Sequence, residues 1–414
     1  MSNLRLKAEE LLNSEILCDC GKVHKANLPI LIDESVVDCA KSLVGAGRVL
    51  IFSSKDVSVD FCDALHEEFE KNSFVVQRFL QNFDETTGIE VEEGTKLIVA
   101  IGTKKLIERA KLMAQRYRTK LIAVPLCFDF YKISMPQSAL NYGGVRLTRV
   151  SRAPDKIIVK SGLLERVDDK VFGAILGSLY SKITAFIDYF YQGILSGEFC
   201  EDIVLSAFEA YKKINAIGFP RNSQNVKILI DCALKINAYL AFCGMDEGGE
   251  SQLALTIERF IRENDRKIIP SGEILFLSSL IISKTYLKFL STNTPFSVSD
   301  GFEDINQIQK VLSLGEGEII RFITKGEEDY KYKDYKVSLM KDELKKLVEI
   351  GDDLLKCANV KLKRVYRDGA FHVRYFLTST ETLSLLSLSP FYTYQETLLS
   401  FMKERGLLNF NEKV

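Results

Sequence analysis

The chain has 414 residues, of which 46% are hydrophobic, so it can bury large cores, and this excludes a disordered or fibrous protein. Its 55 basic and 56 acidic residues leave a net charge of −1, which offers no overall attraction to nucleic acid or to an anionic membrane. Its nine cysteines follow no framework spacing, which is typical of thiols in a reducing compartment, and no run approaches the roughly 20 apolar residues of a membrane span. We therefore expect a cytoplasmic protein of two or three domains, at roughly 150 residues for each domain.

The first 165 residues predict an α/β domain with a Rossmann-like parallel sheet. Apolar runs of strand length alternate there with segments whose apolar residues recur at helical spacing. The strands are expected at residues 48–52, 73–79, 96–101, 120–125 and 156–159, with helices at 57–72 and 103–117. Strands that alternate with helices of this length favour parallel βαβ units with right-handed crossovers.

The turn after the third of these strands is a candidate binding site. It reads Ala100-Ile-Gly102-Thr-Lys104-Lys105, and it joins a strand to the start of a helix. Backbone N–H groups and the dipole at a helix N-terminus favour an anion, and the two lysines add positive charge. A bound phosphate is one interpretation of this turn, and an ordinary strand-to-helix turn with solvated lysines is the other.

From residue 166 to the end, the pattern predicts a helical domain. Apolar stripes at helical spacing indicate helices at residues 171–192, 203–213, 225–243, 250–263, 272–290, 304–313 and 341–358. Residues 291–301 are expected to form a loop, and the highly charged residues 325–336 a solvated connection. The last segment, residues 389–408, predicts one more packed helix.

Two cysteines and a histidine lie close together in the sequence near the N-terminus. Cys18, Cys20 and His24 could supply three ligands to a metal ion, with Cys39 as a conceivable fourth. A second pair of ligands would usually follow a C-x₂₋₄-C or H-x₃₋₅-H pattern, so a short turn with incidental thiols is the alternative. Elsewhere, Cys127 is considered as a nucleophile, although no histidine lies near it in the sequence.

Several short motifs follow one another in the order that one enzyme family uses. They are Cys18-Asp-Cys20-Gly-Lys-Val-His24 for C-x-C-G-x-x-H, Ile101-Gly102-Thr103 for a glycine-rich dinucleotide turn, Val124-Pro125 for a V-P-T loop, Gly177-Ser178 through Lys182 for G-D-x-x-x-K, Asp188-Tyr189 for D-W, Glu250-Ser251 through Glu258 for E-H-x-x-x-H-x-x-E, and Ser271-Gly-Glu273 for H-G-E. By these motifs the chain resembles the glycerol-1-phosphate dehydrogenase branch of the dehydroquinate synthase and iron-containing alcohol dehydrogenase superfamily. The likeness covers nearly the whole chain and depends on the order and spacing of degraded motifs.

The resemblance implies both a fold and a cofactor. The implied fold is dehydroquinate synthase-like, with an α/β dinucleotide-binding-like domain over residues 1–165 and a helical domain, which holds metal and substrate in the family, over residues 166–414. The implied cofactor is NAD or NADP, and the matching cofactor-binding positions are Gly102, Thr103, Lys104, Glu108 and Leu126. Ala100 and Ile101 replace two family glycines, which normally let the backbone approach the pyrophosphate.

The metal ligands of the family are replaced in this chain. Members of the family hold zinc or iron with one aspartate and two histidines, and the metal polarises the substrate's hydroxyl as a Lewis acid. The matching positions are Ser178, Ser251 and Ser271, and no histidine occurs between His66 and His372. A hydroxyl is a weak ligand for such a metal. We therefore expect no metal at the family site, where three hydroxyls suit a phosphate, a sugar or water better.

Three functions are compatible with these features. The first is a diverged family member that binds a nucleotide or a phosphorylated small molecule in the cleft between its domains and has lost metal-assisted hydride transfer. The second is an active, metal-independent NAD(P)-dependent polyol-phosphate oxidoreductase, with Asp129, Tyr131, Tyr180 and Lys182 as candidate acid–base groups. The third is a non-catalytic subunit that pairs with an intact paralogue. Neither nucleic acid nor a membrane is expected as a partner, and a homo-oligomer stays open.

Overall fold

The chain is described from a computed structural model. The residues it describes are 6–18, 20–81, 90–142, 145–217, 222–245, 247–264, 266, 269–292, 328–365, 377, 379–389, 397–404 and 408. They form two compact units. Unit 1 comprises Met1–Leu179 and Glu209–Gly244, and unit 2 comprises Tyr180–Phe208 and Met245–Val414.

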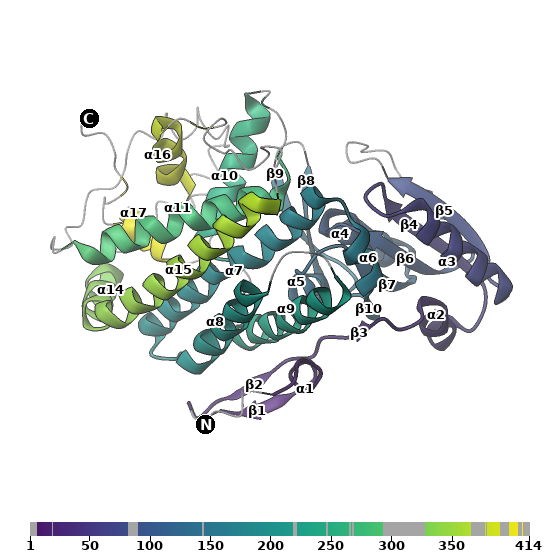
Figure 1. Cartoon of the computed structure of the whole chain (residues 1–414), viewed down its shortest axis with the longest axis horizontal. Coiled ribbons are helices and arrows are strands. Elements are labelled where there is room, and N and C mark those ends of the chain that lie inside the picture. Colours follow the sequence, from purple (N-terminus) through teal and green to yellow (C-terminus); the bar gives the residue numbers. More distant parts are fainter. Residues whose placement is uncertain are drawn as a thin grey trace. The chain divides into compact units, whose positions relative to one another are not determined.

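Unit 1 is built on a six-stranded sheet in which all neighbouring strands are parallel (Figure 1). In spatial order its strands are β3 (Ile30–Ile32), β10 (Lys156–Val159), β7 (Lys120–Pro125), β6 (Thr95–Gly102), β4 (Arg48–Ser54) and β5 (Val75–Gln81). The five predicted strands are confirmed within two residues at most of their ends. The strand β3 was not predicted, because three residues are too few to show a pattern of their own.

Helices connect and cover these strands. They are α1 (Ala8–Leu12), α2 (Val36–Val44), α3 (Val59–Lys71), α4 (Lys104–Tyr117), α5 (Phe130–Ser134), α6 (Ser161–Arg166) and α9 (Ser223–Cys243). Both α2 and α4 pack on β6 and β7. The central strands are therefore buried, and residues 97–101 and 121–124 have no exposed surface. This burial explains why they read as continuous apolar runs rather than as alternating ones.

Two short antiparallel hairpins complete unit 1, and neither was predicted. One pairs β1 (Glu15–Leu17) with β2 (Val23–Lys25), and the other pairs β8 (Gln137–Tyr142) with β9 (Val145–Val150). The first hairpin lies beside α9, which also packs on α1 (Figure 1).

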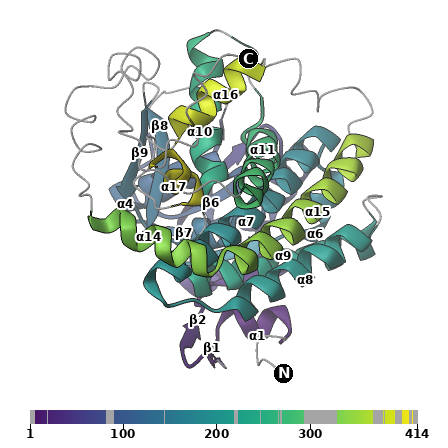
Figure 2. The same ribbon diagram turned by 90° about the vertical axis from the view of Figure 1, so that its left-hand side faces the viewer.

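Unit 2 consists of helices over its described residues. They are α10 (Gly249–Glu263), α11 (Ser271–Ser291), α14 (Glu328–Leu339), α15 (Lys341–Val365), α16 (Ser379–Leu388) and α17 (Leu398–Glu404). Two more helices, α7 (Asp169–Ser196) and α8 (Glu201–Ala216), contribute residues to both units. The helix α11 packs on α10 and on α15 (Figure 2). The predicted helices that fall on described residues are confirmed.

Two predictions for the helical region were wrong in extent. The charged stretch 325–336 was expected to be a connection, but helix α14 begins at Glu328. Charges do not prevent a helix, because opposite charges four residues apart favour one. The packed helix expected over residues 389–408 is helical only at Leu398–Glu404 among the described residues. The helix expected at 304–313, most of the loop at 291–301, and His372 lie outside the described residues.

The predicted domain boundary follows a different criterion from the two units. It was placed at residue 165, where strands give way to helices, whereas the two units follow packing and assign α9 to unit 1. The boundary at residue 165 stays a prediction.

Two described helices, α7 and α11, are long and apolar enough to span a membrane by length and composition alone. In α7, however, 89% of the most apolar stretch is buried inside the protein, as in the core helix of a soluble protein. Two helices that qualify by length and composition alone are weak evidence for a membrane span.

Candidate functional site

The carboxyl ends of β4 and β6 mark the switch in strand order within unit 1. The strand β4 lies between β5 and β6, so the chain adds β5 on one side of β4 and then β6 on the other. Ligands of open parallel sheets bind at such a switch, beyond the carboxyl ends of the strands. Ser54 ends β4, Gly102 ends β6, and α4 begins two residues later at Lys104. The turn identified in the sequence therefore occupies the position that favours a ligand.

Gly102 is required by its surroundings. Its φ of +146° is a conformation that residues with a side chain rarely adopt, and a Cβ atom at this position would overlap the Ser54 hydroxyl. Its carbonyl accepts a hydrogen bond of 2.7 Å from the N–H of Leu126, at the start of the loop after β7. The structure thus brings together two predicted cofactor-binding residues, Gly102 and Leu126.

The loop after β7 is held in place by one buried amide that the sequence analysis missed. Asn237 of α9 accepts a hydrogen bond of 2.8 Å from the N–H of Tyr131 and donates one of 2.7 Å to the carbonyl of Phe128. Its side chain is 1% exposed. The available signal was a single amide inside an otherwise apolar helical stripe, which indicates burial with partners but not which partners.

Replacing Asn237 by alanine is expected to lower the free energy of unfolding by about 2 kcal/mol or more, because it leaves a buried N–H and a buried carbonyl without partners. Urea unfolding followed by circular dichroism measures this loss. The matched control is Asn264→Ala, which removes an amide that bonds the Phe260 carbonyl at an exposed helix end. Equal losses for the two variants would contradict the role assigned to Asn237.

Asp129 lies in this loop and contacts two other predicted residues, Ser178 and Lys104. Its carboxylate is buried, accepts a hydrogen bond of 2.9 Å from the hydroxyl of Ser178, and lies 3.6 Å from the ammonium of Lys104. A lysine at the start of α4, a carboxylate after β7 and a serine at a family metal position therefore form one cluster in unit 1. Tyr131 lies two residues further along and is also buried.

The carboxylate of Glu108, on α4, already has a charged partner inside the protein. The carboxylate of Glu108 is buried and lies 3.3 Å from the ammonium of Lys111, one turn along the same helix. Lys111 has no exposed surface and also donates to the carbonyl of Gln137 at 2.5 Å. Burial lowers the pKa of Lys111, and the charge of Glu108 opposes that change. Glu108 thus has an internal partner, and its role in cofactor binding stays a prediction.

The structure gives no support to Cys127 as a nucleophile. Its thiol is buried, and that burial raises the pKa of Cys127 to about 12. The reactive form of cysteine is the thiolate, which such a pKa disfavours at neutral pH.

A second polar cluster surrounds Glu250 in unit 2. Its carboxylate accepts hydrogen bonds from the hydroxyl of Thr184 at 2.7 Å, from the hydroxyl of Ser251 at 3.0 Å and from the N–H of Gly248 at 3.1 Å. Burial raises the pKa of Glu250, and the charge of Lys182 opposes this rise. Lys182, a predicted catalytic residue, therefore belongs to unit 2, whereas Asp129 and Tyr131 belong to unit 1.

Asp188, also in unit 2, accepts hydrogen bonds from the backbone N–H groups of Gly249 at 2.7 Å and Leu398 at 2.9 Å, and from the Tyr286 hydroxyl at 3.0 Å. Burial raises the pKa of Asp188 to about 7, against the effect of these donors. A Cβ atom on Gly248 or Gly249 would meet the Asp188 carboxylate or the Tyr286 hydroxyl. Asp188 therefore joins the starts of α10 and α17.

The three serines at the family's metal positions do not fit a divalent metal. Ser178 and Ser251 each donate their hydroxyl proton to a carboxylate, Asp129 and Glu250 respectively. Ser271 begins α11. Imidazole, thiolate and carboxylate are the ligands that zinc and iron prefer, and none of these positions carries one.

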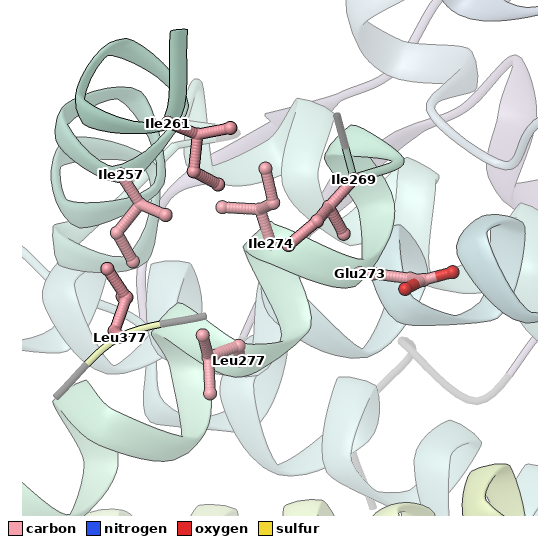
Figure 3. Close-up of a pocket in the computed structure, with 7 residues that line it drawn as sticks. All are labelled: Ile257, Ile261, Ile269, Glu273, Ile274, Leu277 and Leu377. Carbon is pink, nitrogen blue, oxygen red and sulfur yellow. The ribbon is translucent and has the colours of Figure 1, made fainter. Parts of the chain in front are cut away.

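A separate pocket lies in unit 2. It is lined by residues of α10 and α11 and by two neighbouring segments: Ile257, Ile261, Ile269, Glu273, Ile274, Leu277 and Leu377 (Figure 3). The aliphatic side chains face one another, whereas the carboxylate of Glu273 points away from them. The pocket is small and apolar and contributes no group to the sites above.

Sequence comparison relates part of the chain to known proteins. A scan against protein-family models finds no match. The chain is 26% identical over 195 residues to the glycerol-1-phosphate dehydrogenase [NAD(P)+] of Sulfurisphaera tokodaii, which covers 45% of the chain and 56% of that protein. It is 23% identical over 179 residues to the enzyme of the same name from Aeropyrum pernix, covering 40% of the chain and 51% of that protein. The match thus spans about half the length of these relatives.

Comparison with solved structures relates the fold as a whole. An iron-containing alcohol dehydrogenase from Thermococcus thioreducens matches with a TM-score of 0.54 at 15% identity, over 93% of this chain and 99% of the other. An archaeal halo-thermophilic alcohol dehydrogenase from a Red Sea brine pool matches with a TM-score of 0.56 at 12% identity, over 92% of this chain and 97% of the other. At such identities the likeness shows the fold alone. The chain is thus similar in sequence to glycerol-1-phosphate dehydrogenases over part of its length, and its fold resembles that of iron-containing alcohol dehydrogenases.

Proposed function

We propose that the chain is a diverged glycerol-1-phosphate dehydrogenase-like protein that binds a nucleotide or a phosphorylated small molecule and has lost metal-assisted hydride transfer. One observation supports the loss of metal-assisted hydride transfer. At two of the three family metal positions, the serine hydroxyl donates its proton to a buried carboxylate. A hydroxyl is a weak ligand for zinc or iron.

The ligand is expected at the turn between β6 and α4. This turn lies at the switch in strand order, Gly102 allows close approach of the backbone, and α4 offers its N-terminus to an anion. Lys104 and Lys105 follow at once and supply positive charge. The relatives are named as NAD(P)+-dependent, so NAD and NADP are the first ligands to test.

The two lysines at the turn favour a negatively charged ligand. Lys104 is held 3.6 Å from Asp129, so an incoming phosphate would share that lysine with the carboxylate. Lys105 is exposed and can turn to a phosphate without breaking a buried contact. A phosphorylated ligand is therefore favoured over an uncharged one.

Gly102→Ala is expected to weaken NADPH binding at least about tenfold, since it strains the backbone and forces the turn away from Ser54. The chain contains no tryptophan, so nicotinamide fluorescence can be titrated without tryptophan background. Gly162→Ala is the matched control, because a Cβ atom there meets nothing within 4 Å. Lys105→Met, which leaves the backbone intact, should weaken binding several-fold. Unchanged affinity in both binding-site variants, or no binding of NADH, NADPH or glycerol phosphate by the unmodified chain, contradicts the proposal.

The second candidate function is metal-independent oxidoreduction, favoured by the buried Asp129 beside Lys104. Turnover of glycerol 1-phosphate with NAD(P)+ in chelator-treated protein, abolished by Asp129→Asn, would support it. Turnover that requires added zinc or iron would instead restore the family's own mechanism. The non-catalytic subunit stays the third proposal, and light scattering of the purified chain, alone and with an intact relative, tests it together with the homo-oligomer.

A further inference from the structure

The N-terminal hairpin of unit 1 gathers two cysteines and a histidine. Cys18 follows β1, and His24 lies on β2, paired with Ile16. Gly21, at a φ of +80°, donates its N–H to the carbonyl of Cys18 at 2.9 Å and closes the turn. Cys20 lies within this turn, and its Sγ is 3.3 Å from Nε2 of His24.

The three ligand atoms are close enough to share one metal ion. The Sγ atoms of Cys18 and Cys20 and a ring nitrogen of His24 all lie within 4.8 Å of one another. Around tetrahedral zinc, with Zn–S of about 2.3 Å and Zn–N of about 2.0 Å, neighbouring ligand atoms are roughly 3.5–3.8 Å apart. Small side-chain rotations therefore suffice to bring these atoms into coordination. Cys39, on α2, does not belong to this group.

The histidine is held in a buried position. It is 5% exposed, and its ring lies 5.8 Å from the ring of Phe242 on α9. A ring nitrogen of an imidazole fixed in this way can be offered to a cation.

The hairpin is short and partly exposed. Each of its strands has three residues, and Leu17 and Val23 are 66% and 61% exposed. Two-stranded hairpins are marginally stable by themselves in water, and a structural zinc ion contributes folding free energy directly. Two of the three ligands, Cys18 and His24, are buried, whereas Cys20 is exposed in the turn.

We propose that Cys18, Cys20 and His24 hold a structural zinc ion that fixes this hairpin. Binding releases the two thiol protons to solvent, so that two thiolates and one neutral imidazole face the cation. Two thiolates with an imidazole form a ligand set that favours zinc over magnesium or calcium. The fourth ligand is either another thiolate or water. The site shares no residue with the proposed ligand site, so each proposal can fail without the other.

The test is the zinc content of tag-free protein, measured by mass spectrometry of the elements. We expect about one zinc per chain, lost in Cys18→Ser, Cys20→Ser and His24→Ala. Cys357→Ser, at an exposed cysteine outside the cluster, is the matched control and should keep its zinc. Cobalt substitution gives a second measurement, because a thiolate–cobalt absorption band should appear in the unmodified chain and be lost in Cys20→Ser.

Replacing each remaining cysteine in turn then identifies the fourth ligand. Absence of zinc and of any cobalt–thiolate band in the unmodified chain overturns the proposal. A disulfide between Cys18 and Cys20, or zinc retained in full by Cys20→Ser, overturns it as well.

Discussion

Replacing Lys111 by alanine is expected to lower the free energy of unfolding by about 3–5 kcal/mol, because it leaves the carboxylate of Glu108 buried without its cation. The loss is increased by the carbonyl of Gln137, which accepts a hydrogen bond of 2.5 Å from the same ammonium. Urea unfolding at neutral pH, followed by circular dichroism, measures the change.

Two controls separate this effect from the general cost of losing a lysine. Lys71→Ala breaks an exposed pair with Glu67 and should change stability by less than about 1 kcal/mol. The double variant Lys111→Met with Glu108→Leu removes both charges and should recover most of the loss, since apolar side chains of similar volume often replace a buried ion pair without penalty. A double variant as unstable as Lys111→Ala would show that packing, and not the buried charge, decides the effect.

In the unmodified protein, the free energy of unfolding is expected to fall between about pH 4 and pH 7 because of Asp188. Asp188→Asn should remove this fall. Burial raises the pKa of Asp188 from 3.8 to about 7, so the folded state binds a proton that the unfolded state releases. The contribution of Asp188 to stability is therefore fully present below about pH 4 and falls as the pH rises to about 7. The change amounts to at most about 4 kcal/mol.

Asparagine is the suitable replacement because, like the protonated carboxyl, it is uncharged and has a carbonyl oxygen that accepts and a second group that donates. The measurement is the free energy of unfolding of the unmodified protein and of Asp188→Asn at several pH values. The difference between these two free energies should close or reverse as the pH rises. Tyr286→Phe removes one donor to the carboxylate and should shift the transition to higher pH. Parallel pH profiles for the unmodified protein and Asp188→Asn would contradict the buried titration.

Both of these large effects depend on contacts that the sequence does not reveal. Lys111 and Glu108 are three residues apart on a helix, a spacing equally common in solvated pairs, and only packing shows that neither is exposed. Asp188 is recognisable as part of a degraded motif, but its partners Gly249, Tyr286 and Leu398 lie 61 to 210 residues away.

The sequence by itself determined the class of the fold. The strands β4, β6 and β7 are apolar runs because they are buried, and the long helices carry apolar stripes at helical period, so both signals are local. The absence of histidine between His66 and His372 is likewise a property of the sequence alone.

The tertiary structure alone decided which polar groups meet. It joined Ser178 to Asp129 and Asn237 to the loop after β7. Those pairings arise from packing between segments far apart in the chain. No local pattern encodes them, because the free energy that selects them comes from burying and pairing polar groups in the folded protein.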